Sequence, residues 1–498
     1  MASGTEVPEL KRVSHAYFLI VDYWVVAYSQ AAHRLIFTSM NITIIGSGYV
    51  GLTTGLSLAY VGHSVTCLDV DAEKIALLNR GQMPFHEPFA AEMLRATKSR
   101  LAFTNDEQDA LASAEVIYIA VGTPSGHDGT ADLKYVRAAA DAIGKFMPAR
   151  YTVVINKSTV PIGSASMVES LVRRSYLKHR VNGQDKSMAE AQLGVASNPE
   201  FLREGSALAD SLYPDRIVIG TDDPRALTIL KKLYKPFLEQ TFAPPKFLPR
   251  ADGTTDVPLV CTSVVSAELI KYSANAFLAT KISFANELSL LSEHCGASIE
   301  DVARGIGLDH RIGPTFLRAG LGWGGSCFGK DTLALVRTAA DYGMELHITQ
   351  AARTANCRQR AQAVVRLQQE LKILQGKTIG VLGLAFKADT DDLRDSPALD
   401  AIRSLLDRGV RVQVYDPQAM DRMRREFSDW PLEYCCCAEG VAVNADAVLL
   451  ATEWSEFRNL RLKMMASKMR TPLFVDGRNF LDPKTVRKAG LRYVGFGR

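Results

Sequence analysis

The chain has 498 residues, of which 47% are hydrophobic and 22% charged, as is ordinary for a globular protein. Its length exceeds what one hydrophobic core normally serves, so we expect two or three domains. A formal net charge of +4, dispersed along the chain, argues against nucleic acid as a partner. Eight cysteines without zinc-type spacing argue against a metal site and for a reducing, cytoplasmic compartment.

Residues 1–39 are the segment least like the rest of the chain, and we interpret them as an extension that is disordered or not native. The apolar run from Phe18 to Tyr28 is too short to span a bilayer and contains Asp22, so no membrane association is expected. A signal peptide is the alternative, but the run lacks a clean basic flank. Met40 directly precedes the first predicted strand and offers an alternative start.

The first strong motif is an apolar run, 42–45, that leads into Gly46-Ser-Gly48-Tyr-Val-Gly51 and a helix-like segment. A second predicted strand, 64–68, ends in Asp69, at the distance where an acid binds the ribose of a dinucleotide. The glycines allow a tight turn and bring the pyrophosphate to the helix N-terminus. Asp69 would repel the extra phosphate of NADP, so NAD is the predicted cofactor. A strand-glycine-helix unit without any ligand is the alternative.

Further strands are predicted over 116–121 and 152–156, each followed by a turn and a helix, which indicates a doubly wound parallel sheet. We therefore predict a Rossmann domain over 40–240. The turns after these strands hold Thr123 and Thr159 at the carboxyl edge, where such sheets bind ligands.

Residues 266–295 contain neither proline nor glycine and predict one long helix, the spine of a central domain over 258–345. Lys271 and Asn275 are spaced i and i+4 on this helix, so both could converge on one ligand. The alternative is a solvated lysine beside a surface asparagine.

The segment 322–331, Gly-Trp-Gly-Gly-Ser-Cys-Phe-Gly-Lys-Asp, places the thiol of Cys327 among glycines. Glycines let a ligand approach the backbone, and the adjacent Lys330 favours the thiolate, which is the nucleophilic form. A buried structural cysteine is the alternative. A nucleophilic thiol and a nicotinamide site in one chain suggest oxidation of an aldehyde through a thioester.

A second α/β unit is predicted from 377 to 476, within a domain over 370–498. It repeats the strand and helix pattern of the first domain but lacks its glycine fingerprint, so it should bind a different phosphorylated ligand. Lys387 and Arg394 are its expected anion partners. The expected fold class is α/β, with two Rossmann-like doubly wound domains joined by a long central helix.

The motifs, taken in order, closely resemble the nucleotide-sugar dehydrogenase family over about residues 40 to 485. The motifs are Gly46-Ser-Gly48-Tyr-Val-Gly51, Val121-Gly-Thr-Pro124, Lys157-Ser-Thr-Val-Pro161, Asn198-Pro-Glu-Phe-Leu-Arg-Glu-Gly205, Pro214-Asp-Arg-Ile-Val-Ile-Gly220, Lys271-Tyr-Ser-Ala-Asn275, Gly324-Gly-Ser-Cys-Phe-Gly-Lys-Asp331 and Phe386-Lys-Ala-Asp-Thr390. The residues around Cys327 and the segment 274–278 look like the branch that uses UDP-glucose. GDP-mannose and UDP-N-acetylhexosamine relatives usually differ there.

The resemblance implies NAD-dependent, four-electron oxidation of UDP-glucose to UDP-glucuronate. Cys327 would capture the intermediate aldehyde as a thiohemiacetal, which a second NAD oxidises to a thioester. Water would then hydrolyse the thioester. The catalytic residues implied by the family are Cys327, Lys271, Asn275, Asp331, Glu200 and Thr159, and the base at each step is left open.

The binding residues are likewise implied by the resemblance. Cofactor positions are Gly46, Gly48, Tyr49, Val50, Gly51, Asp69, Lys74, Thr123, Thr159, Glu204, Lys330 and Arg394. Substrate positions are Glu200, Phe201, Leu202, Arg203, Glu204, Lys271, Asn275, Arg311, Phe316, Leu317, Arg318, Ala319, Gly320, Gly324 and Lys387. Arg311 corresponds to an arginine that reaches the sugar across a dimer interface, so a homodimer or higher homo-oligomer is expected.

Two alternatives remain open. One is a dehydrogenase of another nucleotide sugar, and the other is an inactive NAD-binding regulatory protein. The joint presence of the six catalytic positions argues against the second alternative, since a scaffold has no physical need for all of them.

Overall fold

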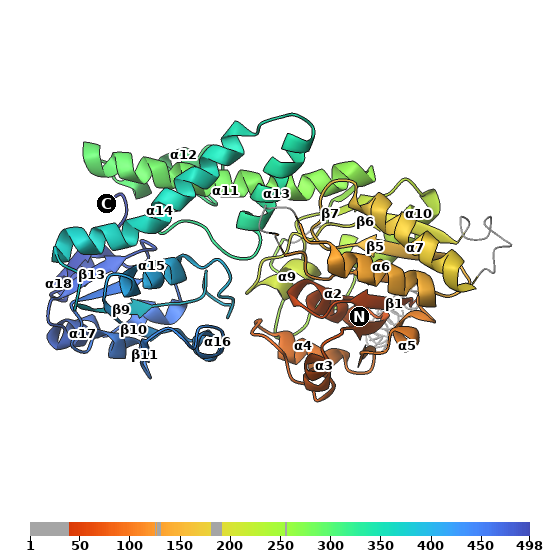
Figure 1. The fold of residues 1–498 in the computed structure, drawn as a ribbon, viewed down its shortest axis with the longest axis horizontal. Helices are drawn as coiled ribbons and strands as arrows, with labels where there is room; N and C mark the ends of the chain where they lie inside the picture. Colours follow the sequence, from red (N-terminus) through yellow and green to blue (C-terminus); the bar gives the residue numbers. More distant parts are fainter. Residues whose placement is uncertain (1–38, 125, 127–130, 181–191, 254–255) are drawn as a thin grey trace, which may run out of the picture.

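The computed structural model describes residues 39–124, 126, 131–180, 192–253 and 256–498. The predicted N-terminal extension, apart from Ser39, lies outside the described residues. Two α/β domains lie side by side, and a long helix, α11, runs along one edge of both (Figure 1). This arrangement confirms the predicted fold class.

The first domain is built on an eight-stranded sheet in the order β3-β2-β1-β4-β5-β6-β7-β8. Its first six strands are parallel and follow the order 3-2-1-4-5-6 of dinucleotide-binding folds, with the topological switch between β1 and β4. The strands are β1 Asn41–Ile45, β2 Ser64–Leu68, β3 Leu101–Thr104, β4 Val116–Ile119, β5 Thr152–Asn156, β6 Leu193–Ser197, β7 Ile217–Gly220 and β8 Leu259–Thr262. The pair β7 and β8 runs antiparallel to the other six. β8 falls within the predicted central region, yet it pairs with β7.

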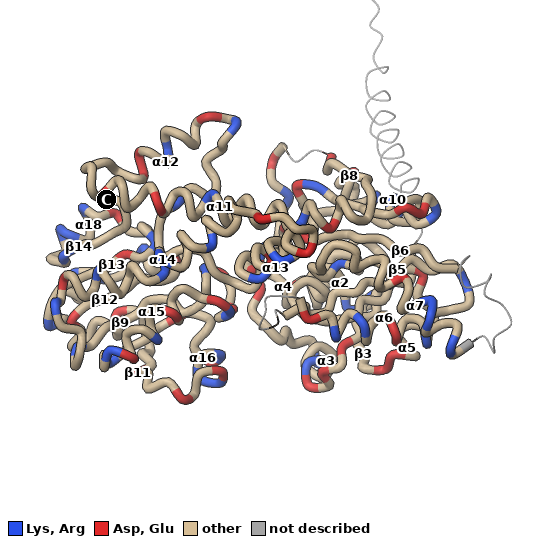
Figure 2. The backbone as a smooth tube through the Cα atoms, turned by 45° about the horizontal axis from the view of Figure 1, so that its top comes forward, with Lys and Arg blue, Asp and Glu red and all other residues tan. Residues whose placement is uncertain are grey.

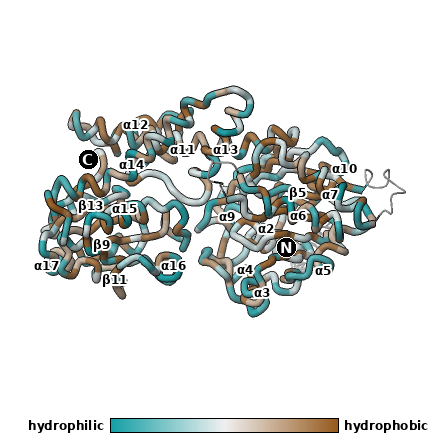
Figure 3. The backbone as a smooth tube through the Cα atoms, in the orientation of Figure 1, coloured by the Kyte–Doolittle hydropathy of each residue, from teal (hydrophilic) through white to brown (hydrophobic). Residues whose placement is uncertain are grey.

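The central strands of this sheet are continuous apolar runs in the sequence because the sheet is buried on both faces. Every residue of β4, β5 and β6 is buried, as expected for parallel strands covered on both faces. Alternate residues face two separate cores, so Tyr118 and Ile155 pack on one side while Ile117 and Val154 pack on the other. The covering helices are α2 Tyr49–Tyr60, α3 Ala72–Asn79, α4 Ala90–Thr97, α5 Glu107–Leu111, α6 Lys134–Phe146, α7 Ser164–Arg180, α9 Ala207–Leu212 and α10 Pro224–Leu238. Hydrophobic segments accordingly gather in the sheets (Figure 3).

The central region confirms the predicted long helix. α11 spans Val264–Cys295 and begins at Ser263, whose hydroxyl accepts a hydrogen bond from the amide of Ser266. It ends at Gly296, which has a left-handed φ of +76°. The other helices here are α12 Ile299–Gly307, α13 Phe328–Asp341 and α14 His347–Leu371.

The second domain repeats the dinucleotide-binding topology in a six-stranded, fully parallel sheet, β11-β10-β9-β12-β13-β14. Its strands are β9 Thr378–Leu382, β10 Arg411–Tyr415, β11 Leu432–Tyr434, β12 Ala447–Leu450, β13 Leu473–Asp476 and β14 Arg492–Val494. The two edge strands, β11 and β14, were not predicted because three residues give no readable periodicity. The helices are α15 Pro397–Leu406, α16 Met420–Glu426, α17 Leu462–Lys468 and α18 Pro483–Lys488, with 3-10 turns at Ala438–Ala442 and Ser455–Asn459.

Basic and acidic residues alternate over both domains rather than gathering by sign (Figure 2). Within the described part of the chain, no helix combines the length and the apolar character needed to cross a bilayer.

Close packing of α6 on α7 yields a stability prediction. A Cβ added at Gly144 would lie 2.4 Å from the carbonyl oxygen of Val172 and 2.8 Å from the amide of Tyr176, both backbone atoms. We expect Gly144→Ala to lower the free energy of unfolding by about 2 kcal/mol, because overpacking outweighs the gain in helix propensity. Urea unfolding followed by circular dichroism measures the change.

The matched control is Gly305→Ala in α12, where an added Cβ would contact nothing within 4 Å. It should leave stability unchanged or raise it by up to about 1 kcal/mol, since only helix propensity changes. Equal behaviour of the two variants would contradict this account of the contact between α6 and α7.

Candidate active site

The thiol of Cys327 stands at the start of a helix. A glycine-rich segment, 322–325, precedes it, and Cys327 occupies the N-cap position of α13. Helix dipoles favour a thiolate at this end. Burial acts in the opposite direction and raises the pKa of Cys327 to about 11, while the ammonium of Lys271 lowers it. The thiol is therefore largely protonated at neutral pH until a ligand or a proton acceptor changes its surroundings.

The cation beside this thiol differs from the predicted one. Lys330 was expected to favour the thiolate, but its ammonium lies 2.5 Å from a carboxylate oxygen of Asp331 and is engaged there. The cation that acts on Cys327 comes from Lys271, on α11. The prediction considered only the spacing from Cys327 to Lys330 and not the buried carboxylate of Asp331, which competes for the ammonium.

Lys271 and Asn275 both turn inward from α11, with only 5% and 7% of their surface exposed. Lys271 Nζ donates a hydrogen bond of 3.0 Å to Glu200 Oε2, and Asn275 Nδ2 donates one of 2.6 Å to Asp331 Oδ2. The i and i+4 spacing thus brings two donors to one place, and the alternative of a solvated lysine is wrong.

The charges of this cluster keep Lys271 protonated. Burial by itself lowers the pKa of its ammonium, but Glu200, Cys327 and Asp331 together raise the pKa above the ordinary value. Asp331 is fully buried and accepts hydrogen bonds from Asn275 and Lys330. The arrangement supplies a nucleophile, two hydrogen-bond donors and two carboxylates within one buried space.

A loop at the carboxyl ends of β4 and β5 completes one side of the site. The hydroxyl of Thr123 donates a hydrogen bond of 2.8 Å to the carbonyl of Thr159, so these two predicted residues meet. Glu268 holds the same loop, because its carboxylate accepts hydrogen bonds from the amides of Gly163, at 2.7 Å, and Ala165, at 3.0 Å. Glu268 lies on α11, one turn before Lys271, and fixes the Thr159 loop to the catalytic helix.

The dinucleotide turn has the geometry that its sequence predicts. Gly46 adopts a φ of +100°, and a Cβ at Gly51 would lie 1.8 Å from the carbonyl oxygen of Gly46, so only glycine fits. Gly48, at the start of α2, has open space in front of it. Asp69 accepts hydrogen bonds from the amide of Ser47, at 2.7 Å, and from Lys74, at 3.0 Å. The glycine turn and Asp69 therefore lie side by side, which lets one site bind the pyrophosphate and the adenosine ribose of a dinucleotide.

Contacts between the two domains pass beside this turn. Tyr49 donates a hydrogen bond of 2.5 Å to Asp391, and Arg394 lies 3.0 Å from Glu204. Burial raises the pKa of Glu204 to about 8, with Asp392 adding to the rise and Arg394 opposing it. The second sheet thus carries charged groups into the space beside the cofactor turn.

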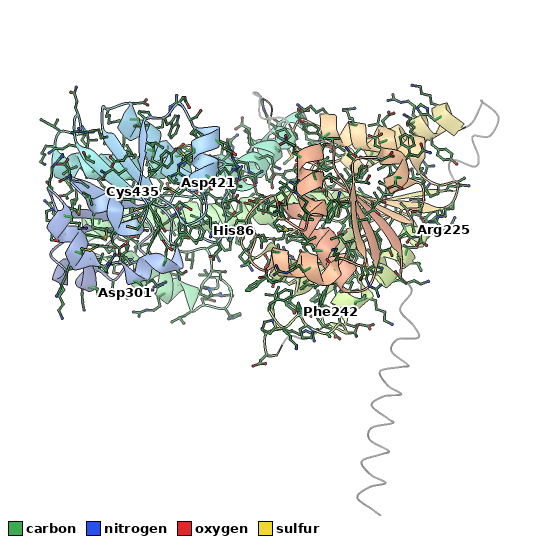
Figure 4. The ribbon with its side chains drawn as sticks, turned by 90° about the horizontal axis from the view of Figure 1, so that it is seen from below. His86, Arg225, Phe242, Asp301, Asp421 and Cys435 are labelled. Carbon is green, nitrogen blue, oxygen red and sulfur yellow. The ribbon has the colours of Figure 1, made fainter. Side chains whose placement is uncertain are left out.

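The loop before α4 holds residues 205–207, which follow the predicted substrate positions 200–204, through Glu87, a residue that the sequence analysis did not identify. Glu87 accepts hydrogen bonds of 2.7 Å from the amides of Gly205 and Ala207, and burial raises its pKa to about 7. Lys387 of the second domain lies within electrostatic range of it, and the neighbouring His86 lies between the two halves of the molecule (Figure 4). For Glu87 the available signal was an acid in a loop rich in aromatic and proline residues, which is weak, and Glu268 is one of several acidic residues on a long helix.

Some predicted substrate residues do not join the cluster. Arg311 is exposed and pairs with Asp309 at 2.6 Å, and Arg203 is exposed and pairs with Asp210 at 2.6 Å. Arg318 is also exposed. Other predicted substrate residues are packed within the protein. The ring of Phe201 lies beneath the guanidinium of Arg216, Leu202 is half-buried, and Phe316 packs against Phe328. Leu317 and Ala319 are buried, and Gly320 and Gly324 lie against the backbone of the second domain.

Three family models match the chain in order. Residues 40–238 match the NAD binding domain, 265–358 the central domain and 380–483 the UDP binding domain of the UDP-glucose/GDP-mannose dehydrogenase family. The chain belongs to this family. Its first sheet is therefore an NAD binding domain, which confirms the predicted cofactor and excludes a ligand-free unit. Its second sheet is a UDP binding domain, in line with the predicted second phosphorylated ligand.

Relatives match over nearly their whole length. The UDP-glucose 6-dehydrogenase of Rhizobium meliloti is 44% identical over 92% of this chain and 100% of its own. The UDP-glucose 6-dehydrogenase TuaD of Bacillus subtilis is 40% identical over 92% of this chain and 93% of its own. A solved UDP-glucose dehydrogenase from Pyrobaculum islandicum has a TM-score of 0.80 and 39% identity, covering 92% and 98% of the two chains. A UDP-D-ManNAc dehydrogenase from Pyrococcus horikoshii has a TM-score of 0.76 and 26% identity, covering 92% and 99%.

Two glycines of the family's NAD turn should respond differently to alanine. Gly48 has an ordinary φ of −78° and open space, so Gly48→Ala should fold normally. Its methyl group would occupy the approach of the pyrophosphate, and we expect the dissociation constant for NAD to rise by at least about tenfold. Calorimetric titration with NAD measures the change.

Gly51→Ala is the matched variant, and the collision with Gly46 should lower its melting temperature in the absence of any ligand. The proposed distinction between a ligand contact and a packing contact would be wrong if both variants lost stability alike.

Proposed function

We propose that the chain oxidises UDP-glucose to UDP-glucuronate in two NAD-dependent steps, through a covalent intermediate on Cys327. The observation that carries this proposal is the buried cluster of Cys327, Lys271, Asn275, Asp331 and Glu200. It lies where the NAD binding domain, the central helix and the UDP binding domain meet. A two-electron alcohol dehydrogenase has no use for a nucleophile in that position.

NAD supplies the hydride acceptor for both oxidations. In the first, Lys271 transfers one of its protons to Glu200 and takes the proton of the alcohol on C6 of the sugar, so that it ends the step protonated. The 3.0 Å contact between Lys271 and Glu200 supports this transfer. The thiol of Cys327 then adds to the aldehyde carbon and its proton passes to the aldehyde oxygen, whose developing negative charge Lys271 and Asn275 stabilise by hydrogen bonds.

The second oxidation converts the thiohemiacetal to a thioester, and water hydrolyses it. Asp331 and Glu200 are the carboxylates beside the thiol, and Thr159 lies on the loop that Glu268 fixes to α11. We propose that Asp331, Glu200 and Thr159 orient the attacking water molecule. Hydrolysis releases the product acid and makes the sequence irreversible.

The family's binding positions form the rest of the proposal. Asp69 and Lys74 bind the adenosine ribose of NAD, and the turn around Gly48 binds its pyrophosphate. Thr123, Glu204, Lys330 and Arg394 face the cofactor from the other side. Lys387 binds the UDP group together with the segments 200–204 and 316–320. In this proposal the predicted domains are retained: residues 40–240 bind NAD, residues 258–345 form the central domain, and residues 370–498 bind the UDP group.

Identity favours UDP-glucose over other nucleotide sugars. Relatives named for UDP-glucose are 40% to 44% identical to this chain, whereas the structure titled UDP-D-ManNAc dehydrogenase is 26% identical. All eight cysteines are free, which supports a reducing, cytoplasmic compartment.

We also propose a homodimer formed along α11. An apolar stripe on this helix consists of Val265, Leu269, Phe277, Phe284 and Leu291, all exposed. Its last three members recur every seven residues and so share one face, and Phe277 and Leu291 are 65% and 59% exposed. Arg311 does not contact Cys327, Lys271 or Glu200 of its own chain, and in the dimer it would reach the active site of the other subunit.

The stoichiometry of the reaction tests the proposed function. We expect two NADH per UDP-glucose consumed, because the alcohol and the thiohemiacetal are each oxidised once. Cys327→Ser should form no thioester and lose at least about a thousandfold in kcat, since the thiol is the nucleophile. Absorbance at the NADH band, with mass spectrometry of the quenched enzyme, measures both. One NADH per sugar, or an active serine variant, would contradict the thioester route.

The dimer is tested by charge on the apolar stripe. The double variant Phe277→Arg with Phe284→Arg should be monomeric in light-scattering chromatography, because a buried interface cannot solvate four guanidinium groups. Ile373→Arg, at another exposed apolar position, serves as the control.

Mixing experiments test the role of Arg311. Arg311→Ala and Cys327→Ser should each be nearly inactive, but mixed dimers should regain activity, because one site then has both residues. A monomeric wild type, or mixtures without activity, would refute the shared site.

A further inference from the structure

A cavity of about 100 Å³ lies in the first domain, and its lining includes Glu200, the hydrogen-bond partner of Lys271. Its lining runs from buried groups, Ser57 and Glu200, to strongly exposed ones, Arg203 and Asp215, whose side chains are 64% and 93% exposed. A water molecule needs roughly 10–15 Å³ of such space, so the cavity has room for several. It therefore forms a path, lined by both polar and apolar groups, from Glu200 to the solvent.

The polar groups of the cavity are arranged to hold water. The hydroxyl of Ser57 is buried and has no hydrogen-bond partner among the described residues. Lys157 donates a hydrogen bond of 3.0 Å to Asn198 Oδ1, which leaves two of the three ammonium protons for other partners. Asn198 is fixed in turn by the hydroxyl of Tyr234, at 2.5 Å, and by the carbonyl of Val218, at 2.7 Å.

The proposed reaction creates a need for such a path. UDP-glucose, two NAD and one water yield UDP-glucuronate, two NADH and three protons. The residues that first receive these protons are buried, since Lys271 is 5% exposed and Glu200 7%. Without an exit, a proton on Glu200 would block the next transfer from Lys271.

We propose that Lys157 and the water of this cavity carry protons from Glu200 to the solvent. The proposal rests on the proposed function. Glu200 gives up the proton that it received from Lys271, cavity water transfers it to the neutral amine of Lys157, and the resulting ammonium releases it to water at the outer end. No bond other than those to the proton changes, and no oxidant or reductant is needed. Lys157 is a positioning residue in this scheme and does not touch the substrate.

The titration of Lys157 agrees with this role. Burial lowers its pKa to about 8, Glu200 raises it and Lys271 lowers it further. Below that pH the ammonium is already charged and accepts no proton, so kcat should rise with pH through about 8. The other titratable groups around the cavity are Tyr234 on α10, Arg216 at β7, and Arg203, Asp210, Tyr213 and Asp215 around α9.

Chemical rescue of Lys157→Ala tests the proposal. We expect kcat to fall by at least about tenfold while KM for UDP-glucose changes less than about twofold, because only proton removal is impaired. Added methylamine should restore kcat, since it fits the space left by the side chain, and a series of amines should show rescue that depends on their pKa. Lys157→Met is the matched control, because it removes the charge but fills the space, and it should be slow and not rescued.

The outcomes separate the two proposals. Wild-type turnover with two NADH, together with an unimpaired Lys157→Ala or a slow variant that amines do not rescue, would overturn the relay and leave the function standing. An unchanged pH profile in Lys157→Met would also overturn it. Absence of turnover by the wild type would overturn both. Thermal melting of each variant shows that it is folded.

Discussion

The active site depends on one buried ion pair, between Lys271 of α11 and Glu200 of the segment after β6. A buried ammonium is costly unless a carboxylate lies against it, and here the 3.0 Å contact keeps Lys271 charged despite burial. That contact also ties the central helix to the NAD binding domain. Removing either partner would leave an unpaired buried charge, so chemistry and domain geometry share the same two residues.

The same helix relates the other parts of the site to this pair. Asn275 lies one turn further on and reaches Asp331, so the position of α13 and its thiol is fixed relative to Lys271. Glu268 lies one turn before it and holds the loop of Thr159. Three successive turns of one helix thus contact the Thr159 loop, the segment after β6 and the first turn of α13, and one rigid element sets the positions of all three.

The second domain meets the NAD binding domain through charged contacts, while its hydrophobic core continues into α14 of the central region. Arg394 meets Glu204, and Tyr49 meets Asp391, both at the edge of the cofactor turn. Such polar contacts are typical of interfaces between domains that move relative to each other. Burial and Asp392 raise the pKa of Glu204 to about 8, while Arg394 lowers it and so favours the charged carboxylate.

The sequence by itself determined both α/β domains, the long helix, the NAD turn and the candidate nucleophile, because each rests on local periodicity or on residues close together in the chain. It placed the strands 64–68 and 152–156 to the residue, and it paired Lys271 with Asn275 through helical spacing. Short edge strands such as β11 and the anchoring carboxylates Glu87 and Glu268 left a local signal too weak to identify them. Only the tertiary structure decided which cation faces Cys327, since Lys330 turns to Asp331 while Lys271 arrives from a distant helix. It also decided that Lys157 and Glu200 line one cavity, because burial and long-range charge depend on what packs around a residue and not on its neighbours in sequence.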